Sequence, residues 1–153
     1  MKVGGERVPA MPVHRKYAQM LGLDSKMCSM IDSYIDRVKR HRFGNFTVGE
    51  TWSTSELLNV AELFYERFGE SGLRVFVLHH TLDAICRLLH SGRASRERVL
   101  VEVSARLDEL ARGLSGGERE LCKLLTEIAT EVRGLLEREG EELLEDIAPG
   151  AVL

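Results

Sequence analysis

Apolar residues recur at helical spacing along most of the chain. From Ser25 onwards the apolar positions Met27, Ile31, Tyr34 and Val38 fall at i, i+4, i+7 and i+11, which predicts one face of an amphipathic helix. The same period predicts four further helices at residues 53–68, 73–90, 95–114 and 115–148. Short polar or glycine-containing joints between these helices are typical of an antiparallel bundle.

Glycine, proline and small polar residues mark the ends of the predicted helices. Ser53 with Glu56, and Ser115 with Glu118, have the spacing of a capping box, and Ser95 is a single predicted cap. Gly69 and Gly92 are the expected C-terminal stops, and the last helix is expected to break or kink near Gly140.

The first third of the chain has a different pattern. Residues 1–13 contain two glycines and two prolines without any period, so we expect an extended arm, followed by a short helical turn over 14–21. Residues 43–52 have the glycine and aromatic content of a loop or short hairpin. The sequence thus predicts an all-α protein, an antiparallel four-helix-type bundle preceded by an extended N-terminal arm and a basic helix. The predicted divisions are 1–43 (arm and helices), 44–52 (joint), 53–148 (bundle) and 149–153 (tail).

Composition limits the class of protein. A chain of 153 residues, 44% hydrophobic and 29% charged, is expected to form one globular domain, and no apolar run reaches a membrane span. Charges throughout the first twenty residues argue against a signal peptide, so we expect a virion or cytoplasmic location. Cys28, Cys86 and Cys122 are isolated and predict reduced thiols. Sixteen arginines against five lysines, with only three amide side chains, favour a thermophilic source.

Charge is distributed unevenly along the chain. Residues 1–43 hold nine Lys or Arg against four acids, a balance of +5, whereas the remaining residues have a balance of −8. A basic segment of this kind is suited to a polyanion and binds phosphates without reading bases. The predicted nucleic-acid-binding residues are Lys2, Arg7, Arg15, Lys16, Lys26, Arg37, Lys39, Arg40, His41 and Arg42.

The heptapeptide from Leu114 to Glu120 resembles the signature motif of ABC-type ATPases. That family also needs a phosphate-binding loop of the G-x-x-x-x-G-K-[ST] type, and the chain contains none. A Gly-Gly turn before a helix explains the same residues, so we exclude this class.

His79, Asp83, Cys86 and His90 follow one another at i, i+4, i+7 and i+11 on the helix predicted at 73–90. All four side chains can bind a metal, but they span about 16 Å of a straight helix at 1.5 Å per residue. At most two neighbours could share one ion, and another helix would have to complete the site. From the sequence alone we expect no metal and no cofactor.

Arg74 and His79 resemble the R-x4-H pair of the HEPN ribonucleases, in which His acts as acid or base and Arg stabilises the phosphate. Serine or cysteine catalysis finds no strand-to-helix elbow in this sequence, and the acidic run at 137–146 is typical of a solvated helix face. We therefore expect a protein that is not an enzyme, with an RNA-cleaving HEPN protein as an alternative.

The layout is similar to that of the coat proteins of archaeal rod-shaped and filamentous viruses, in chain length, in composition and in the segment from His14 to Tyr17 after a proline-containing arm. The resemblance implies a structural protein whose copies assemble along double-stranded DNA, with Arg37, Lys39, Arg40 and Arg42 neutralising phosphates. Its partners would be nucleic acid and further copies or a related helical chain. Alternatives are a small helical subunit of a CRISPR effector complex and a protein-interaction bundle.

Overall fold

The computed structural model describes residues 11–38, 54–92, 94–114 and 116–148. These residues form helices and short connecting turns and contain no strand, so the all-α class is confirmed over the part of the chain that is described. The helices are α1 (Met11–Met20), α2 (Ser25–Val38), α3 (Thr54–Ser91), α4 (Arg96–Leu114) and α5 (Glu120–Ile147).

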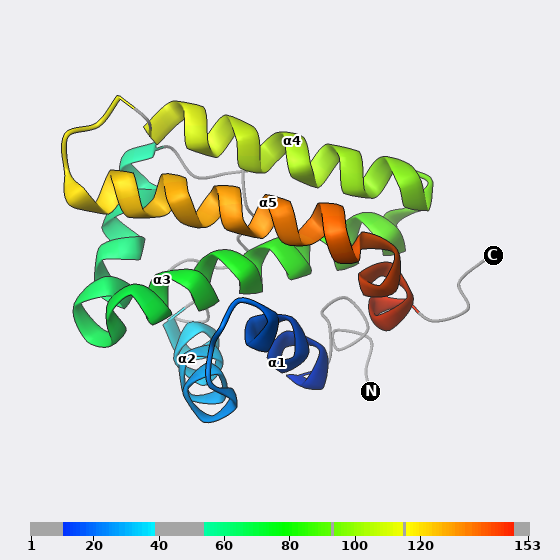
Figure 1. Cartoon of the computed structure of the whole chain (residues 1–153), viewed down its shortest axis with the longest axis horizontal. Helices are drawn as coiled ribbons and strands as arrows, with labels where there is room; N and C mark the ends of the chain where they lie inside the picture. The colour runs from blue at the N-terminus through cyan, green and yellow to red at the C-terminus, as the bar shows by residue number, and fades with distance from the viewer. Residues whose placement is uncertain (1–10, 39–53, 93, 115, 149–153) are drawn as a thin grey trace.

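The long helices lie side by side. In Figure 1 α4, α5 and the second half of α3 form a row, and α4 runs antiparallel to α5. Arg96 at the start of α4 marks this orientation, since it donates to the carbonyl of Ala148 (3.3 Å) beyond the end of α5 and to Glu145 (3.2 Å). Helices α1 and α2 pack on the side of α3 that faces away from α4. Within the described residues neither of them contacts α4.

Helix α3 combines two predicted helices across a bend. Gly69 has φ 71° and ψ −153°, a conformation that favours glycine, at the position where the first helix was predicted to stop. Gly72 lies directly after the bend, and a Cβ on this residue would be 2.6 Å from the carbonyl oxygen of Phe64. The bend therefore brings the two halves of α3 too close together for a larger residue at position 72.

The helix starts follow the predictions in part. Ser95 caps α4 as expected, because its Oγ accepts the backbone N–H of Arg98 at 3.3 Å. The predicted capping box before α5 is wrong: α5 begins at Glu120, and no side chain caps it. The glycines instead continue the turn after α4, where the N–H of Gly117 donates to the carbonyl of Leu114 at 3.0 Å.

The start of α1 and the course of α5 also differ in part from the prediction. Helix α1 begins at Met11, so residues 11–13 of the predicted arm are helical; Pro12 fits because the first helical turn needs no N–H partner. Residues 1–10 of that arm lie outside the described residues.

Helix α5 is continuous through Gly140, which excludes a break, and its last turns change direction in Figure 1. Gly140 also permits a close approach, since its Cβ would meet the side chain of Leu100 at 2.7 Å.

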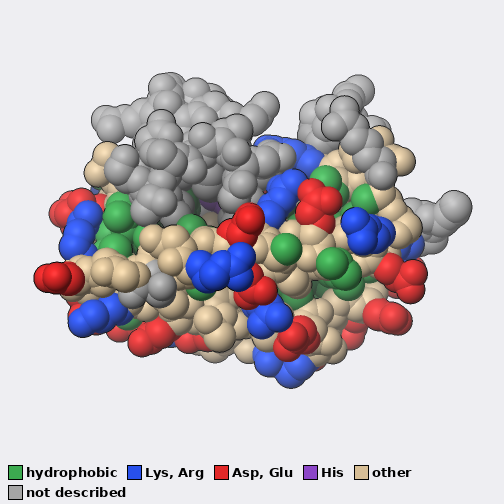
Figure 2. Space-filling model, turned by 90° about the horizontal axis from the view of Figure 1, so that it is seen from above, with side chains coloured by type: hydrophobic (Ala, Val, Ile, Leu, Met, Phe, Trp, Pro, Cys, Tyr) green, Lys and Arg blue, Asp and Glu red, His purple; other side chains and the backbone are tan. Residues whose placement is uncertain are grey.

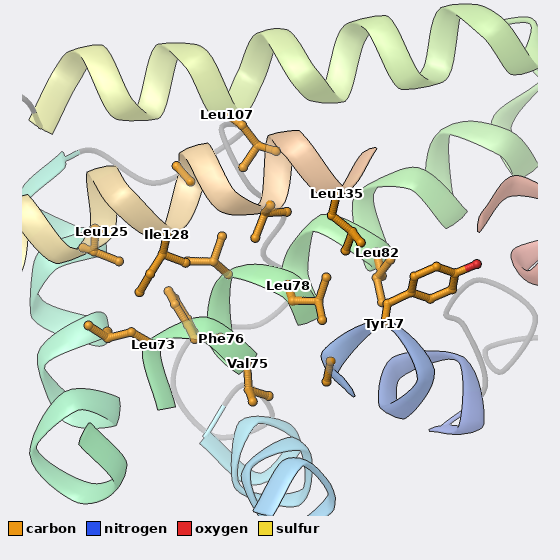
Figure 3. Close-up of a cluster of buried hydrophobic side chains, with 14 of the residues drawn as sticks. Tyr17, Leu73, Val75, Phe76, Leu78, Leu82, Leu107, Leu125, Ile128 and Leu135 are labelled. Carbon is orange, nitrogen blue, oxygen red and sulfur yellow. The ribbon is translucent and has the colours of Figure 1, made fainter. Parts of the chain in front are cut away.

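The hydrophobic core lies between α3, α4 and α5 (Figure 3). Tyr17 extends the core from α1 and is fully buried beside Leu82 and Leu135. Among the described helices, none combines the length and the apolar composition needed to cross a membrane. The core side chains labelled in Figure 3 are Tyr17, Leu73, Val75, Phe76, Leu78, Leu82, Leu107, Leu125, Ile128 and Leu135.

Candidate functional site

Four titratable side chains meet in the interior where α1, α2 and α3 converge. We call His14, Asp32, His79 and Asp83 the His/Asp cluster. Their relative exposures are 4%, 0%, 5% and 0%. Charged or polar groups are costly to bury unless they are paired, so a fully buried set of four is unusual for a protein interior.

Three helices contribute to the cluster. His79 and Asp83 are four residues apart on α3 and so share one face of that helix. His14 comes from α1, and its ring stacks on that of His79 with centroids 4.5 Å apart and an interplanar angle of 21°. Asp32 comes from α2. The polar face of α3 is therefore covered by side chains that lie far from it in the sequence.

Hydrogen bonding fixes the orientation of His79. Its Nδ1–H donates to Oδ1 of Asp32 at 2.9 Å. That bond directs Nε2 towards Asp83, whose Oδ2 is 3.4 Å away. A histidine whose Nδ1–H is held by a carboxylate, with Nε2 facing other ligand atoms, has the arrangement found in carboxylate–histidine–metal sites.

One ligand atom each from His14, His79 and Asp83 lies within 4.8 Å of the other two. Nε2 of His14 is 3.9 Å from Oδ1 of Asp83. Bond lengths of about 2.1 Å to a tetrahedral zinc ion place its ligand atoms about 3.4 Å from one another. The 3.4 Å from Nε2 of His79 to Oδ2 of Asp83 matches this value, and the 3.9 Å from Nε2 of His14 to Oδ1 of Asp83 is longer.

Two Asp carboxylates determine the charge of the cluster. Burial lowers the pKa of His79, but the hydrogen bonds with Asp32 and Asp83 outweigh burial and raise it to about 9. At neutral pH the ion-free ring is therefore an imidazolium between two carboxylates. With His79 protonated, this ring and the carboxylates of Asp32 and Asp83 sum to −1. A divalent ion bound to two neutral imidazoles would bring the same side chains to zero.

The four candidate ligands predicted on α3 fall into two groups. His79 and Asp83 enter the cluster, whereas His90 is exposed and donates through Nδ1 to the carbonyl of Cys86 at 2.8 Å. Burial raises the pKa of the Cys86 thiol to about 12. On α2, Cys28 donates to Oδ2 of Asp32 at 3.4 Å, and burial likewise raises its pKa to about 12. Both thiols are protonated at neutral pH.

Arg74 and His79, the predicted HEPN pair, make separate contacts. Arg74 forms two hydrogen bonds to Glu131 of α5, at 2.9 and 3.1 Å, and one to Glu70 at 3.3 Å. His79 contacts Asp32 and the other members of the cluster. The guanidinium is thus occupied by acids on the surface while the imidazole is buried.

The predicted nucleic-acid-binding residues are only partly described. Lys2, Arg7, Lys39, Arg40, His41 and Arg42, and the side chain of Arg37, lie outside the described residues. Lys26 is exposed. Arg15 donates to Oγ of Ser29 at 3.4 Å.

Lys16, another of the predicted basic residues, pairs with acids at the end of α5. Its Nζ contacts Oδ2 of Asp146 at 2.7 Å and also Glu142, and these hydrogen bonds raise its pKa. Tyr17 beside it donates to the same Oδ2 at 2.6 Å. The charge of Lys16 is therefore balanced within the molecule, and it fastens α1 to α5.

On the α4 side, basic and acidic side chains are interspersed over the coloured part of the surface in Figure 2. The ion pairs of α4 include Arg106 with Glu102 (2.8 Å) and Asp108 with Arg133 of α5 (3.1 Å). The described residues of this face therefore offer no continuous positive tract for a phosphate backbone.

Sequence reasoning identified His79 and Asp83 as candidate ligands and missed His14 and Asp32. One signal for Asp32 was available, since it lies beside Ile31 and four residues after Cys28, on the side of α2 that the structure buries. His14 also had one, since the apolar residues Tyr17, Ala18 and Leu21 follow it at i+3, i+4 and i+7, the spacing of one helix face.

No protein-family model, curated protein or solved structure matches this chain.

Proposed function

We propose that this protein binds one divalent transition-metal ion through Nε2 of His14, Nε2 of His79 and the carboxylate of Asp83. Asp32 orients His79 from the other side of the ring. The observation that carries the proposal is the buried convergence of three ligand atoms within 4.8 Å of one another, one of them on a ring whose Nδ1–H is held by Asp32.

The ligand set indicates the class of ion. Two imidazoles and one carboxylate suit zinc and its neighbours iron, cobalt and nickel. Magnesium and calcium prefer cages made of oxygen ligands. We therefore expect Zn²⁺ to bind and Mg²⁺ not to bind.

Three protein ligands leave at least one coordination position for water or a further group. An ion held in this way acts as a Lewis acid and lowers the pKa of a bound water. The burial of the cluster, with no member more than 5% exposed, also removes competing solvent from around the ion.

A competing explanation needs no ion. Asp32, protonated His79 and Asp83 could form a purely structural triad of charges. Such a triad is most often less stabilising than apolar residues of the same volume, because both carboxylates lose their hydration. Measured metal content distinguishes the two explanations.

The test uses the purified full-length chain, stripped with a chelator and then titrated with Zn²⁺ and Co²⁺. We expect one ion per chain and visible d–d absorption from Co²⁺ in a low-symmetry site. His14→Gln and Asp83→Asn should each weaken binding by at least about tenfold, the loss expected when an ion loses a ligand or a supporting partner. His90→Gln is the matched control, since it removes an exposed histidine from the same helix. A chain that binds no Zn²⁺, or binds equally well in all three variants, would overturn the proposal.

A DNA-coating role is a second, separate proposal. It is supported by the charge balance of +5 over residues 1–43 and by the exposed Lys26 on α2. Arg37 lies in the last turn of the same helix, and Lys39, Arg40 and Arg42 follow it in the sequence. In this role the predicted arm would contact phosphates and a four-helix arrangement would face outwards. Replacing Arg37, Lys39, Arg40 and Arg42 with Gln should abolish binding to a random-sequence duplex, followed by fluorescence anisotropy over a salt series. Unchanged affinity would contradict it.

A further inference from the structure

We infer that the bound ion acts as a clamp, holding α1 and α2 against the rest of the protein, so that metal occupancy determines how tightly they are docked. This inference rests on the metal binding proposed above. We call α1 and α2, residues 11–38, the N-terminal hairpin.

The ligands are divided across a structural boundary. His14 belongs to the hairpin, whereas His79 and Asp83 belong to α3. Asp32, which holds the ring of His79, also belongs to the hairpin. An ion in the cluster therefore bonds the hairpin directly to α3 and cannot stay fully coordinated when the hairpin moves away.

The remaining contacts of the hairpin are apolar or lie near the surface. Tyr34 packs edge-on against Phe64 and Phe68 with ring centroids 5.3 and 5.5 Å apart. The ion pair of Lys16 with Asp146 is partly exposed, and exposed ion pairs contribute little. The centre of the boundary is the His/Asp cluster, where burying two carboxylates carries a desolvation cost.

Most of the buried core belongs to the other three helices, although Tyr17, Ala18 and Ile31 of the hairpin join the same cluster. Leu107, Ile128 and Val132 are at most 1% exposed and lie among α3, α4 and α5. Within the described residues α4 packs on α3 and α5 alone. The hairpin can therefore open as a local unit while these helices stay folded.

Hydrogen exchange of the full-length chain, followed by mass spectrometry, measures this opening. With free Zn²⁺ at about 100 times its dissociation constant, an opening that releases the ion becomes about 100-fold rarer. We expect exchange of the amides in α1 and α2 to slow by up to this factor on addition of Zn²⁺, with little change in α4. Mg²⁺ at the same concentration should have no effect.

Tyr17→Phe provides a control for docking that does not depend on the ion. It removes the 2.6 Å hydrogen bond to Asp146 of α5, a contact outside the His/Asp cluster. We expect exchange in α1 to be faster in both the stripped and the loaded variant, with the same ratio between them as in the wild type.

Two results would overturn the inference, and they are distinguishable. Stoichiometric binding of Zn²⁺ without slower exchange in α1 and α2 would show that the site exists and does not clamp the hairpin, leaving the proposed function intact. An absence of bound Zn²⁺ would overturn both.

Discussion

Replacing Asp32 with Asn is the most informative change to the proposed site. Asn keeps the volume of the side chain and an oxygen that can accept the Nδ1–H of His79, now 2.9 Å from Asp32. It removes only the negative charge. The substitution therefore tests whether this buried carboxylate supports the ion through His79, without deleting a ligand.

The expected magnitude follows from the burial of the bond. Asp32 has no exposed surface, so solvent does not weaken its interaction with the ring. A hydrogen bond to a charged group contributes about 1.5–3 kcal/mol and one to a neutral group about 1 kcal/mol. The difference is about 0.5–2 kcal/mol, a range that includes the roughly 1.4 kcal/mol equivalent to tenfold in affinity, which is the lower end of the roughly 10- to 100-fold losses found for such outer partners. The charge of Asp32 also stabilises the proton that competes with the ion for His79. Because the ion carries twice the charge of that proton, removing the charge of Asp32 weakens ion binding more than proton binding.

Competition with a chromophoric chelator gives the Zn²⁺ affinity of each variant, and far-UV circular dichroism confirms that each is folded. We expect Asp32→Asn to bind about tenfold more weakly than the wild type. Asp24→Asn is the control, because Asp24 lies at the start of the same helix, accepts the N–H of Met27 at 3.3 Å and lies outside the cluster. A folded Asp32→Asn protein with an affinity within twofold of the Asp24→Asn protein would refute the reasoning.

Three further predictions concern the fold. Gly72→Ala should lower the free energy of unfolding in urea by about 1–3 kcal/mol, because its Cβ would meet backbone at 2.6 Å, whereas the exposed Gly116→Ala should change it little. Equal effects of the two would contradict this explanation. The thiols of Cys28 and Cys86, with pKa values of about 12, should resist alkylation at neutral pH in the folded protein and react after unfolding; rapid labelling of the native chain would be inconsistent with their burial. Burial raises the pKa of Asp146, but hydrogen bonds from α1 lower it by more, so its contribution to stability is present above about pH 4 and is lost as pH falls through the folded pKa. Thermal melts should therefore show the wild type losing its advantage over Asp146→Asn at low pH, and a constant difference at all pH values would be the contrary result.

The helices were predictable because each carries a local signal. The apolar period in α2, the glycine at position 69 and the serine at position 95 all lie within or directly beside the element that they define. One local signal had two explanations, because the Ser-Gly-Gly-Glu sequence before α5 can be a helix cap or a turn. The prediction of a cap at the start of α5 was wrong. The hydrogen bond from Gly117 back to Leu114 shows that it is a turn.

The candidate site was predictable only as far as one helix reaches. His79 and Asp83 lie one turn apart on α3, and this spacing is visible in the sequence. Asp32 is 47 residues from His79, and no period or motif connects the two. The same limit applies to Lys16, whose ion-pair partner Asp146 lies 130 residues away.

The position of the cluster also bears on why it is polar. An apolar layer at the same boundary would hold α1 and α2 against α3 permanently, since buried apolar surface is stabilising under all conditions. With Asp32 and Asp83 fully buried, docking instead depends on what balances their charge. A proton on His79 balances one carboxylate, and a divalent ion balances both. With the ion binding proposed above, the stability of this boundary depends on ion concentration, which an apolar boundary cannot achieve, and the ion offsets more of the cost of burying the two carboxylates than the proton on His79 does.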